Sequence, residues 1–159
     1  MDRRSLLLTG VAALGGVALF ARHGARAAPV HYPVEFTPAQ WRAKLNANQF
    51  AVLREQATER PGSSPLLNEH RHGVFACAGC SQKLFDSKTK FESGTGWPSF
   101  YAPLPHAVLT ASDSSLIELR TEVHCITCGG HLGHVFDDGP QPTGLRYCMN
   151  GDAMKFLPA

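Results

Sequence analysis

Hydrophobic positions along this chain of 159 residues fall into three zones with different spacing. An apolar stretch at residues 5–20 comes first, and apolar residues at helical spacing follow between about 37 and 54. From residue 70 onward, short apolar runs alternate with turns rich in glycine and proline. The pattern predicts a leader, two short helices and then a series of β-strands.

Two helix starts are visible in the middle zone. Thr37 precedes Pro38 and has Gln40 three positions further on, which is the pattern of a capping box. Asn46 stands before a second run that contains apolar residues at helical spacing. We expect a short helix after each cap and a loop over residues 58–67, where prolines and a glycine cluster.

The β zone predicts a mainly antiparallel arrangement of short strands. An aromatic and glycine-rich loop is expected at 93–101 and a turn at 137–140. The expected strands lie near residues 74–76, 84–85, 108–109, 116–123, 132–136, 145–150 and 155–157.

The first 27 residues have the pattern of an export signal. Arg3 and Arg4 precede the apolar stretch, and Ala25 and Ala27 offer the small residues that a signal peptidase requires. Twin arginines indicate the Tat route. A different export signal and an uncleaved anchor are the alternatives. We therefore predict a signal peptide over 1–27, a domain over 28–159 and a periplasmic location, with membrane contact only during export.

Charge separates the leader from the rest of the chain. The net charge is +2, but residues 1–27 hold four arginines and one aspartate, a net of +3. The remaining residues carry 11 basic and 12 acidic side chains, a net of −1. A domain near neutrality lacks the basic surface that binds nucleic acid, and that class of function is excluded.

Four of the five cysteines form two Cys-x-x-Cys pairs. Each pair presents two sulfurs from one turn, and two such turns complete a tetrahedral zinc site. Four protein ligands leave no open position, so we expect one structural Zn²⁺. Two disulfides or a redox-active pair are the alternatives. The paired cysteines are Cys77, Cys80, Cys125 and Cys128.

The fifth cysteine, Cys148, is a candidate nucleophile. In an extended strand Arg146, Cys148 and Asn150 share one face, and a neighbouring arginine favours the thiolate. The alternative is an ordinary buried cysteine.

Two histidines and a tryptophan are further candidates. His131 and His134 can donate protons near neutral pH, but residues three apart face opposite sides of a regular strand. Both can serve one site only if the surrounding glycines permit a bulge. Trp97 is either part of the core or an apolar wall for a substrate.

Several motifs together resemble the peptide-methionine (R)-S-oxide reductases. They are the Cys77–Cys80 pair and the stretches 58–61, 89–91, 93–100, 130–136 and 146–150. The resemblance covers about residues 36–157. It implies two small antiparallel sheets in a barrel-like or tent arrangement, short N-terminal helices and a zinc clip away from the active site.

The resemblance also implies roles for individual residues. Cys148 would attack the sulfoxide sulfur and become a sulfenic acid, while His131 and His134 bind and protonate the oxygen. Trp97 would pack on the substrate methyl group. Supporting positions around the thiol are Asn150, Arg146 and Phe136.

The resemblance implies partners as well. These are proteins or peptides oxidised at methionine, and a thioredoxin-like or small-thiol reductant; we expect a monomer. Many relatives carry a resolving cysteine where this chain has Thr95, so an external thiol is expected to recycle Cys148. A zinc-ribbon-like binding module and a Cys-x-x-Cys oxidoreductase are the competing functions.

Overall fold

The structure, a computed structural model, describes residues 30–115 and 119–159. The predicted signal peptide lies outside the described residues, as do positions 116–118 of one expected strand. Within the described part of the chain, no helix has the length and apolar character needed to cross a membrane.

Both predicted helices are present and begin at the predicted caps. Helix α1 spans Pro38–Lys44 and α2 spans Ala47–Glu55. The Thr37 side chain accepts a hydrogen bond from the Gln40 backbone N–H, and the Gln40 side chain accepts one from the Thr37 backbone N–H. Asn46 and Gln49 form the same pair of hydrogen bonds at the start of α2. These caps satisfy N–H groups that the first turn leaves without partners. The helices bury Trp41, Phe50, Val52 and Leu53.

The strands form two sheets in which every pairing is antiparallel. The three-stranded sheet has the order β2-β1-β9, with β1 at Gly73–Cys77, β2 at Lys83–Asp86 and β9 at Met154–Pro158. The six-stranded sheet has the order β3-β4-β8-β7-β6-β5. Its strands are β3 (Lys90–Phe91), β4 (Ser99–Phe100), β5 (Val108–Asp113), β6 (Arg120–Cys125), β7 (His131–Phe136) and β8 (Arg146–Met149).

This architecture confirms the expected fold, and the six described strands of the larger sheet do not close into a barrel. Several element boundaries differ from the sequence prediction. The strand expected over 116–123 is described from Arg120 and continues to Cys125. The loop expected over 58–67 ends in the 3-10 turn η1 (Pro65–Asn68), and the expected aromatic loop ends in β4. Further 3-10 turns are η2 (Ser87–Thr89) and η3 (Gly151–Ala153).

Phenylalanines hold the two sheets together. Phe75 of β1 and Phe85 of β2 both pack on Phe100 of β4, with ring centroids 4.9 Å and 4.4 Å apart. All three side chains are fully buried. Because aromatic pairs add to the free energy of apolar burial, this cluster is a main connection between the sheets.

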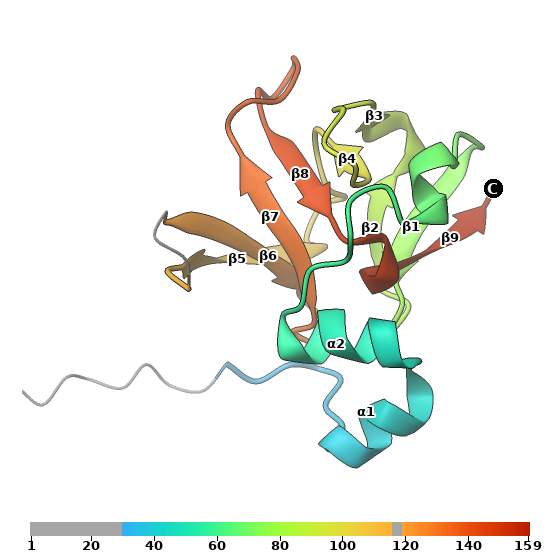
Figure 1. Cartoon of the computed structure of the whole chain (residues 1–159), viewed down its shortest axis with the longest axis vertical. Helices are drawn as coiled ribbons and strands as arrows, with labels where there is room; N and C mark the ends of the chain where they lie inside the picture. Colours follow the sequence, from blue (N-terminus) through green and yellow to red (C-terminus); the bar gives the residue numbers. More distant parts are fainter. Residues whose placement is uncertain (1–29, 116–118) are drawn as a thin grey trace, which may run out of the picture. The chain divides into compact units, whose positions relative to one another are not determined.

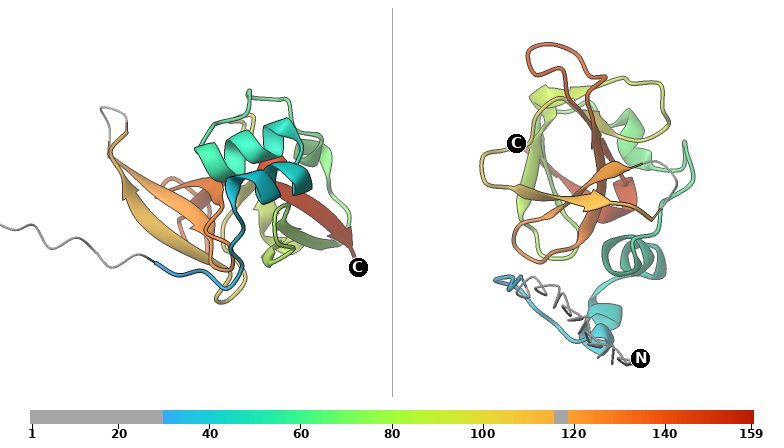
Figure 2. Two further views of the ribbon diagram at one scale, coloured as in Figure 1. Left: turned by 90° about the horizontal axis from the view of Figure 1, so that it is seen from below. Right: turned by 90° about the vertical axis from the view of Figure 1, so that its left-hand side faces the viewer.

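Figure 1 shows α1 and α2 together at one end of the sheets, with α2 beside the start of β7. In the right-hand view of Figure 2 both helices lie below the strands. The core continues from the sheets to the helices through Trp41 and Leu53. Helix α2 contacts both β7 and η3, the turn that follows β8, so the helices lie near the end of β8 that carries Cys148.

Candidate active site and cysteine cluster

Cross-strand pairing places Cys148 in a polar row on the six-stranded sheet. Ser99 of β4 pairs with Cys148, which pairs with His134, which in turn pairs with Glu122 of β6. Directly paired residues point to the same face of a sheet. The register therefore brings a thiol and an imidazole together from separate strands.

The bulge expected near the two histidines is present. The β6–β7 register shifts so that Val123 pairs with Gly133 while His124 pairs with His131. Gly133 has a φ of 155°, and a Cβ there would lie 2.1 Å from the Cys148 carbonyl oxygen. The bulge turns His131 and His134 toward each other, with ring centroids 5.4 Å apart.

A small cavity of about 120 Å³ opens beside the thiol. It is smaller than a typical drug-sized ligand pocket and suits a single side chain. His134 lines the cavity, whereas His131 is 4% exposed and lies outside its lining. The lining consists of Thr58, Trp97, Arg120, Gly133, His134, Phe136, Cys148 and Asn150.

Two opposing influences act on Cys148. Burial raises the pKa of the thiol, while Thr95 and the positive charge of Arg146 lower it, and burial outweighs them. Thr95 Oγ1 lies 3.7 Å from the sulfur. Arg146 is held by two 2.8 Å hydrogen bonds to Asp138 and stacks over Phe136. The thiolate that the sequence predicted from the arginine is thus opposed by desolvation, which the sequence does not reveal.

Carboxylates hold both histidines, and the sequence analysis did not identify them. His131 Nδ1 lies 2.7 Å from Glu122, and His134 Nε2 lies 2.7 Å from Asp113. Asp113 also accepts a 2.6 Å bond from Arg120. The two carboxylates reach the histidines only because of the pairing register of β5 with β6 and of β6 with β7, and the second register includes the bulge. An alternation of charged residues in β6 was the single visible signal.

Burial acts on His131 as well. It lowers the pKa of His131, and the hydrogen bond to Glu122 opposes this shift only in part. The neutral ring then donates from Nδ1 to Glu122, and Nε2 is left as an acceptor. Nε2 is buried and has no hydrogen-bond partner within the described residues.

The four paired cysteines converge at one point. Their sulfur atoms all lie within 4.8 Å of one another. The close contacts join different pairs: Cys77 to Cys128 at 3.8 Å and Cys80 to Cys125 at 3.5 Å. A zinc tetrahedron with bonds of about 2.3 Å has sulfur–sulfur edges of about 3.8 Å. The residues therefore fit a metal ion bound by four thiolates.

The cluster also joins the two sheets. Cys77 ends β1, and Cys125 ends β6. Arg54 of α2 donates a 2.9 Å hydrogen bond to the Cys128 carbonyl oxygen. A metal bound here would link both sheets and α2, as expected for a structural ion.

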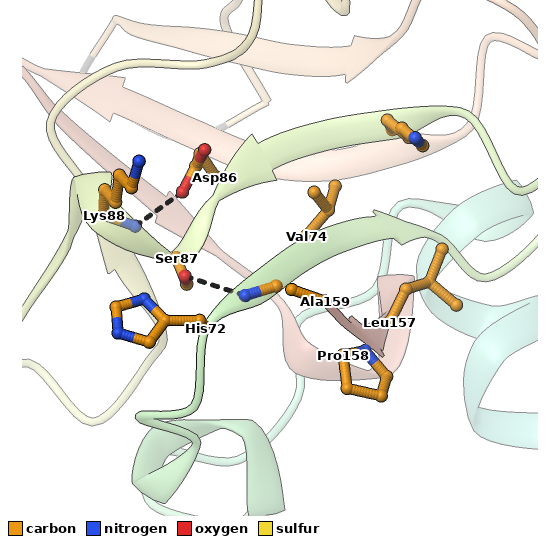
Figure 3. A pocket seen from close by; sticks show the side chains of 10 residues that line it. His72, Val74, Asp86, Ser87, Lys88, Leu157, Pro158 and Ala159 are labelled. Atoms are coloured by element: carbon orange, nitrogen blue, oxygen red, sulfur yellow. Dashed lines mark hydrogen bonds between the residues drawn. The ribbon is translucent and has the colours of Figure 1, made fainter.

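A second hollow, of about 520 Å³, lies on the three-stranded sheet (Figure 3). His72, Ser87 and Lys88 border one side of it, and Leu157 and Pro158 border the other. Its lining contains neither a cysteine nor any residue of the polar row. The chemistry of the molecule therefore centres on the smaller cavity.

Comparisons with known proteins agree with this geometry. The SelR domain family matches residues 45–158. The chain is 51% identical over 126 residues to the peptide methionine sulfoxide reductase MsrB of Agrobacterium fabrum, covering 79% of this chain and 93% of that relative. It is 55% identical over 120 residues to the protein of the same name from Bradyrhizobium diazoefficiens, covering 75% and 86%. A third such relative, from Pseudomonas fluorescens, is 52% identical over 126 residues, covering 79% and 96%.

Proposed function

The chain belongs to the methionine sulfoxide reductase B family and is a peptide-methionine (R)-S-oxide reductase; from this premise we propose that Cys148 reduces the sulfoxide through a sulfenic acid. The observation that carries the proposal is the separation of the thiols. Four lie in the sulfur cluster, and Cys148 alone opens to a cavity with an imidazole and an indole.

The first half of the reaction transfers oxygen from substrate to enzyme. The Cys148 thiolate attacks the sulfoxide sulfur, and the oxygen receives a proton from a histidine. The S–O bond of the substrate breaks, methionine leaves, and oxygen ends on the cysteine as S–OH. We assign the proton transfer to His134, which lines the cavity, and a supporting role to His131, which is buried outside the lining.

The residues that line the cavity support selection of one epimer. Trp97 and Phe136 offer apolar surfaces for the methyl group, and His134 and Asn150 offer polar contacts for the oxygen. Exchanging methyl and oxygen would place a polar atom against an indole and leave a donor without a partner, which costs free energy. The R epimer is the one that the family reduces.

The second half of the reaction restores the thiol. A reductant thiol attacks the sulfenic acid, releases water and forms a mixed disulfide with Cys148. A second thiol then attacks that disulfide, frees Cys148 and leaves as the oxidised reductant. External thiols are required because the other four cysteines of the chain belong to the sulfur cluster.

The experiment treats purified protein with one equivalent of a methionine-(R)-sulfoxide peptide and then with dimedone, a sulfenic-acid trap. We expect one dimedone adduct, on Cys148, and none with the S epimer. Cys148→Ser should lose turnover, because a hydroxyl is a far poorer nucleophile. A disulfide between Cys148 and any cysteine of the cluster would contradict the proposal.

We also propose that the protein is exported through the Tat route and repairs periplasmic proteins. The support is the leader sequence together with the sulfur cluster, since Tat transport of a folded, metal-loaded protein would protect the thiolates from oxidation. Changing Arg3 and Arg4 to lysines keeps the charge and should retain the precursor in the cell. Normal export of this variant would instead indicate another route.

A further inference from the structure

A buried carboxylate lies next to the cavity but outside its lining. Glu59, in the loop after α2, is 9% exposed. Its Oε1 accepts a 2.7 Å hydrogen bond from the Gly151 amide, and its Oε2 accepts a 2.8 Å bond from the Asp152 amide. Both carboxylate oxygens thus hold the chain segment that follows the catalytic strand β8.

The backbone of Glu59 binds two residues that line the cavity. Its N–H donates to Asn150 Oδ1 at 3.0 Å, and its carbonyl oxygen accepts from Trp97 Nε1 at 3.2 Å. The preceding residue, Thr58, lines the cavity itself. One residue therefore connects the indole wall, the amide wall and the segment after Cys148.

Gly151 allows this close approach. A Cβ at that position would lie 1.8 Å from Ser64 Oγ, and Ser64 is buried. A side chain would push the backbone away from Ser64 and from the carboxylate. The glycine and the glutamate thus form one local arrangement.

Burying the Glu59 carboxylate removes it from water, which costs free energy. Burial raises the pKa of Glu59, the two amide hydrogen bonds lower it, and the nearby charge of Asp152 raises it. A buried carboxylate disfavours folding unless hydrogen bonds compensate, and an apolar residue would pack there at less cost. Its backbone bonds two residues that line the cavity, and its carboxylate holds the segment directly after Asn150, which indicates a role in arranging the cavity.

We propose that Glu59 is a positioning residue that fixes Asn150 and the Trp97 indole relative to Cys148. This inference rests on the proposed function of the cavity, since the two fixed groups are those that sort methyl from oxygen. Without the carboxylate, the segment after β8 loses the two hydrogen bonds that its Gly151 and Asp152 amides donate, and the loop that carries the Trp97 acceptor is no longer held from both sides. Substrate recognition should suffer more than the chemistry at sulfur.

The main test is Glu59→Gln, which keeps the shape and one oxygen but sets an NH₂ group against a backbone N–H. We expect KM for an R-sulfoxide peptide to rise about tenfold while kcat falls less than about threefold. Glu55→Gln is the matched control, because Glu55 is an exposed glutamate on α2 and should leave both constants unchanged. An unchanged KM would overturn the proposal.

A second readout does not depend on activity. The Trp97 indole N–H, assigned by its loss in Trp97→Phe, should give an NMR signal protected from hydrogen exchange in the wild type. In Glu59→Gln this signal should shift and exchange faster, and Glu59→Asp, which keeps the charge and both oxygens, should recover part of the protection. An identical indole signal in wild type and Glu59→Gln would overturn the proposal. Failure of the wild type to reduce the sulfoxide would refute the function but leave this test intact.

Discussion

The reactivity of Cys148 depends on a balance between burial and polar contacts. Burial raises the pKa of the thiol, and Thr95 and Arg146 oppose the shift. A raised pKa means that less thiolate exists at neutral pH in the empty cavity.

This balance predicts the pH dependence of alkylation. Without substrate, the rate of Cys148 alkylation by iodoacetamide should rise with pH and reach its midpoint above the range of an ordinary thiol. Arg146→Gln removes a charge that lowers the pKa, so its midpoint should be higher still and its rate at pH 8 lower by on the order of threefold. Rates at strongly alkaline pH should converge, and a wild-type midpoint below the ordinary range would contradict the assignment.

The carboxylate beside His134 supports a second residue-level prediction. Hydrogen bonds from Ser115 and from His134, together with Arg120, hold the pKa of Asp113 well below its usual range. Asp113 is therefore an acceptor for His134 Nε2–H at neutral pH. Asp113→Asn removes the negative charge that orients the ring and balances the positive charge of the imidazolium that donates the proton, so kcat/KM should fall roughly 10²-fold.

The control for this change is Asp137→Asn, an exposed aspartate just after β7. Steady-state kinetics should show wild-type values for the control. Cys148 alkylation should stay similar in both variants, because the thiol environment is unchanged. Equal activity of Asp113→Asn and the wild type would show that His134 needs no carboxylate to orient it.

Among the secondary-structure elements, the two helices were predicted well because their cap residues are visible in the sequence. The caps at Thr37 and Asn46 set the start of both helices. The β6 boundary and the Asp113–His134 contact depend instead on pairing between strands, which no short window of sequence contains. The sequence analysis identified a bulge as a requirement, and only the β6–β7 register located it, between His131 and Gly133.

The loop between β3 and β4 supports a prediction about recycling. It carries Thr95, whose Oγ1 lies 3.7 Å from Cys148 Sγ. Thr95→Cys would put a second sulfur near Cys148, and a disulfide forms if the loop lets the two sulfurs close to about 2.05 Å. After one turnover of this variant, mass spectrometry should find a disulfide between the introduced sulfur and Cys148, and no dimedone adduct.

A matched control is Thr110→Cys, which adds a thiol on the exposed strand β5. That variant should retain the dimedone adduct on Cys148. The Thr95→Cys enzyme should also prefer a dithiol protein reductant over small thiols, since it now presents a disulfide. Persistence of the adduct in Thr95→Cys would mean that the loop holds the new sulfur out of reach.

For the molecule as a whole, the phenylalanine cluster and the sulfur cluster both join the two sheets. The first contributes by apolar burial and is independent of metal. The second depends on an ion, because four thiols at this spacing repel one another once they ionise unless a cation balances them. Removal of the metal should therefore loosen the contact at the sulfur cluster while the phenylalanine cluster stays packed.

The prediction is that each chain binds one zinc ion and that Cys80→Ser loses it. Cys80 is the ligand least buried among the four, so serine should fit there without disturbing the core. We expect the melting temperature to fall by at least about 5 °C, since metal-binding free energy is part of the folding free energy. Cys148→Ser is the matched control: it makes the same change outside the cluster and should keep both zinc and melting temperature while losing turnover. Elemental analysis and calorimetry of the two variants test this prediction. If Cys80→Ser protein lacks metal but keeps full activity and stability, the phenylalanine cluster alone holds the sheets together.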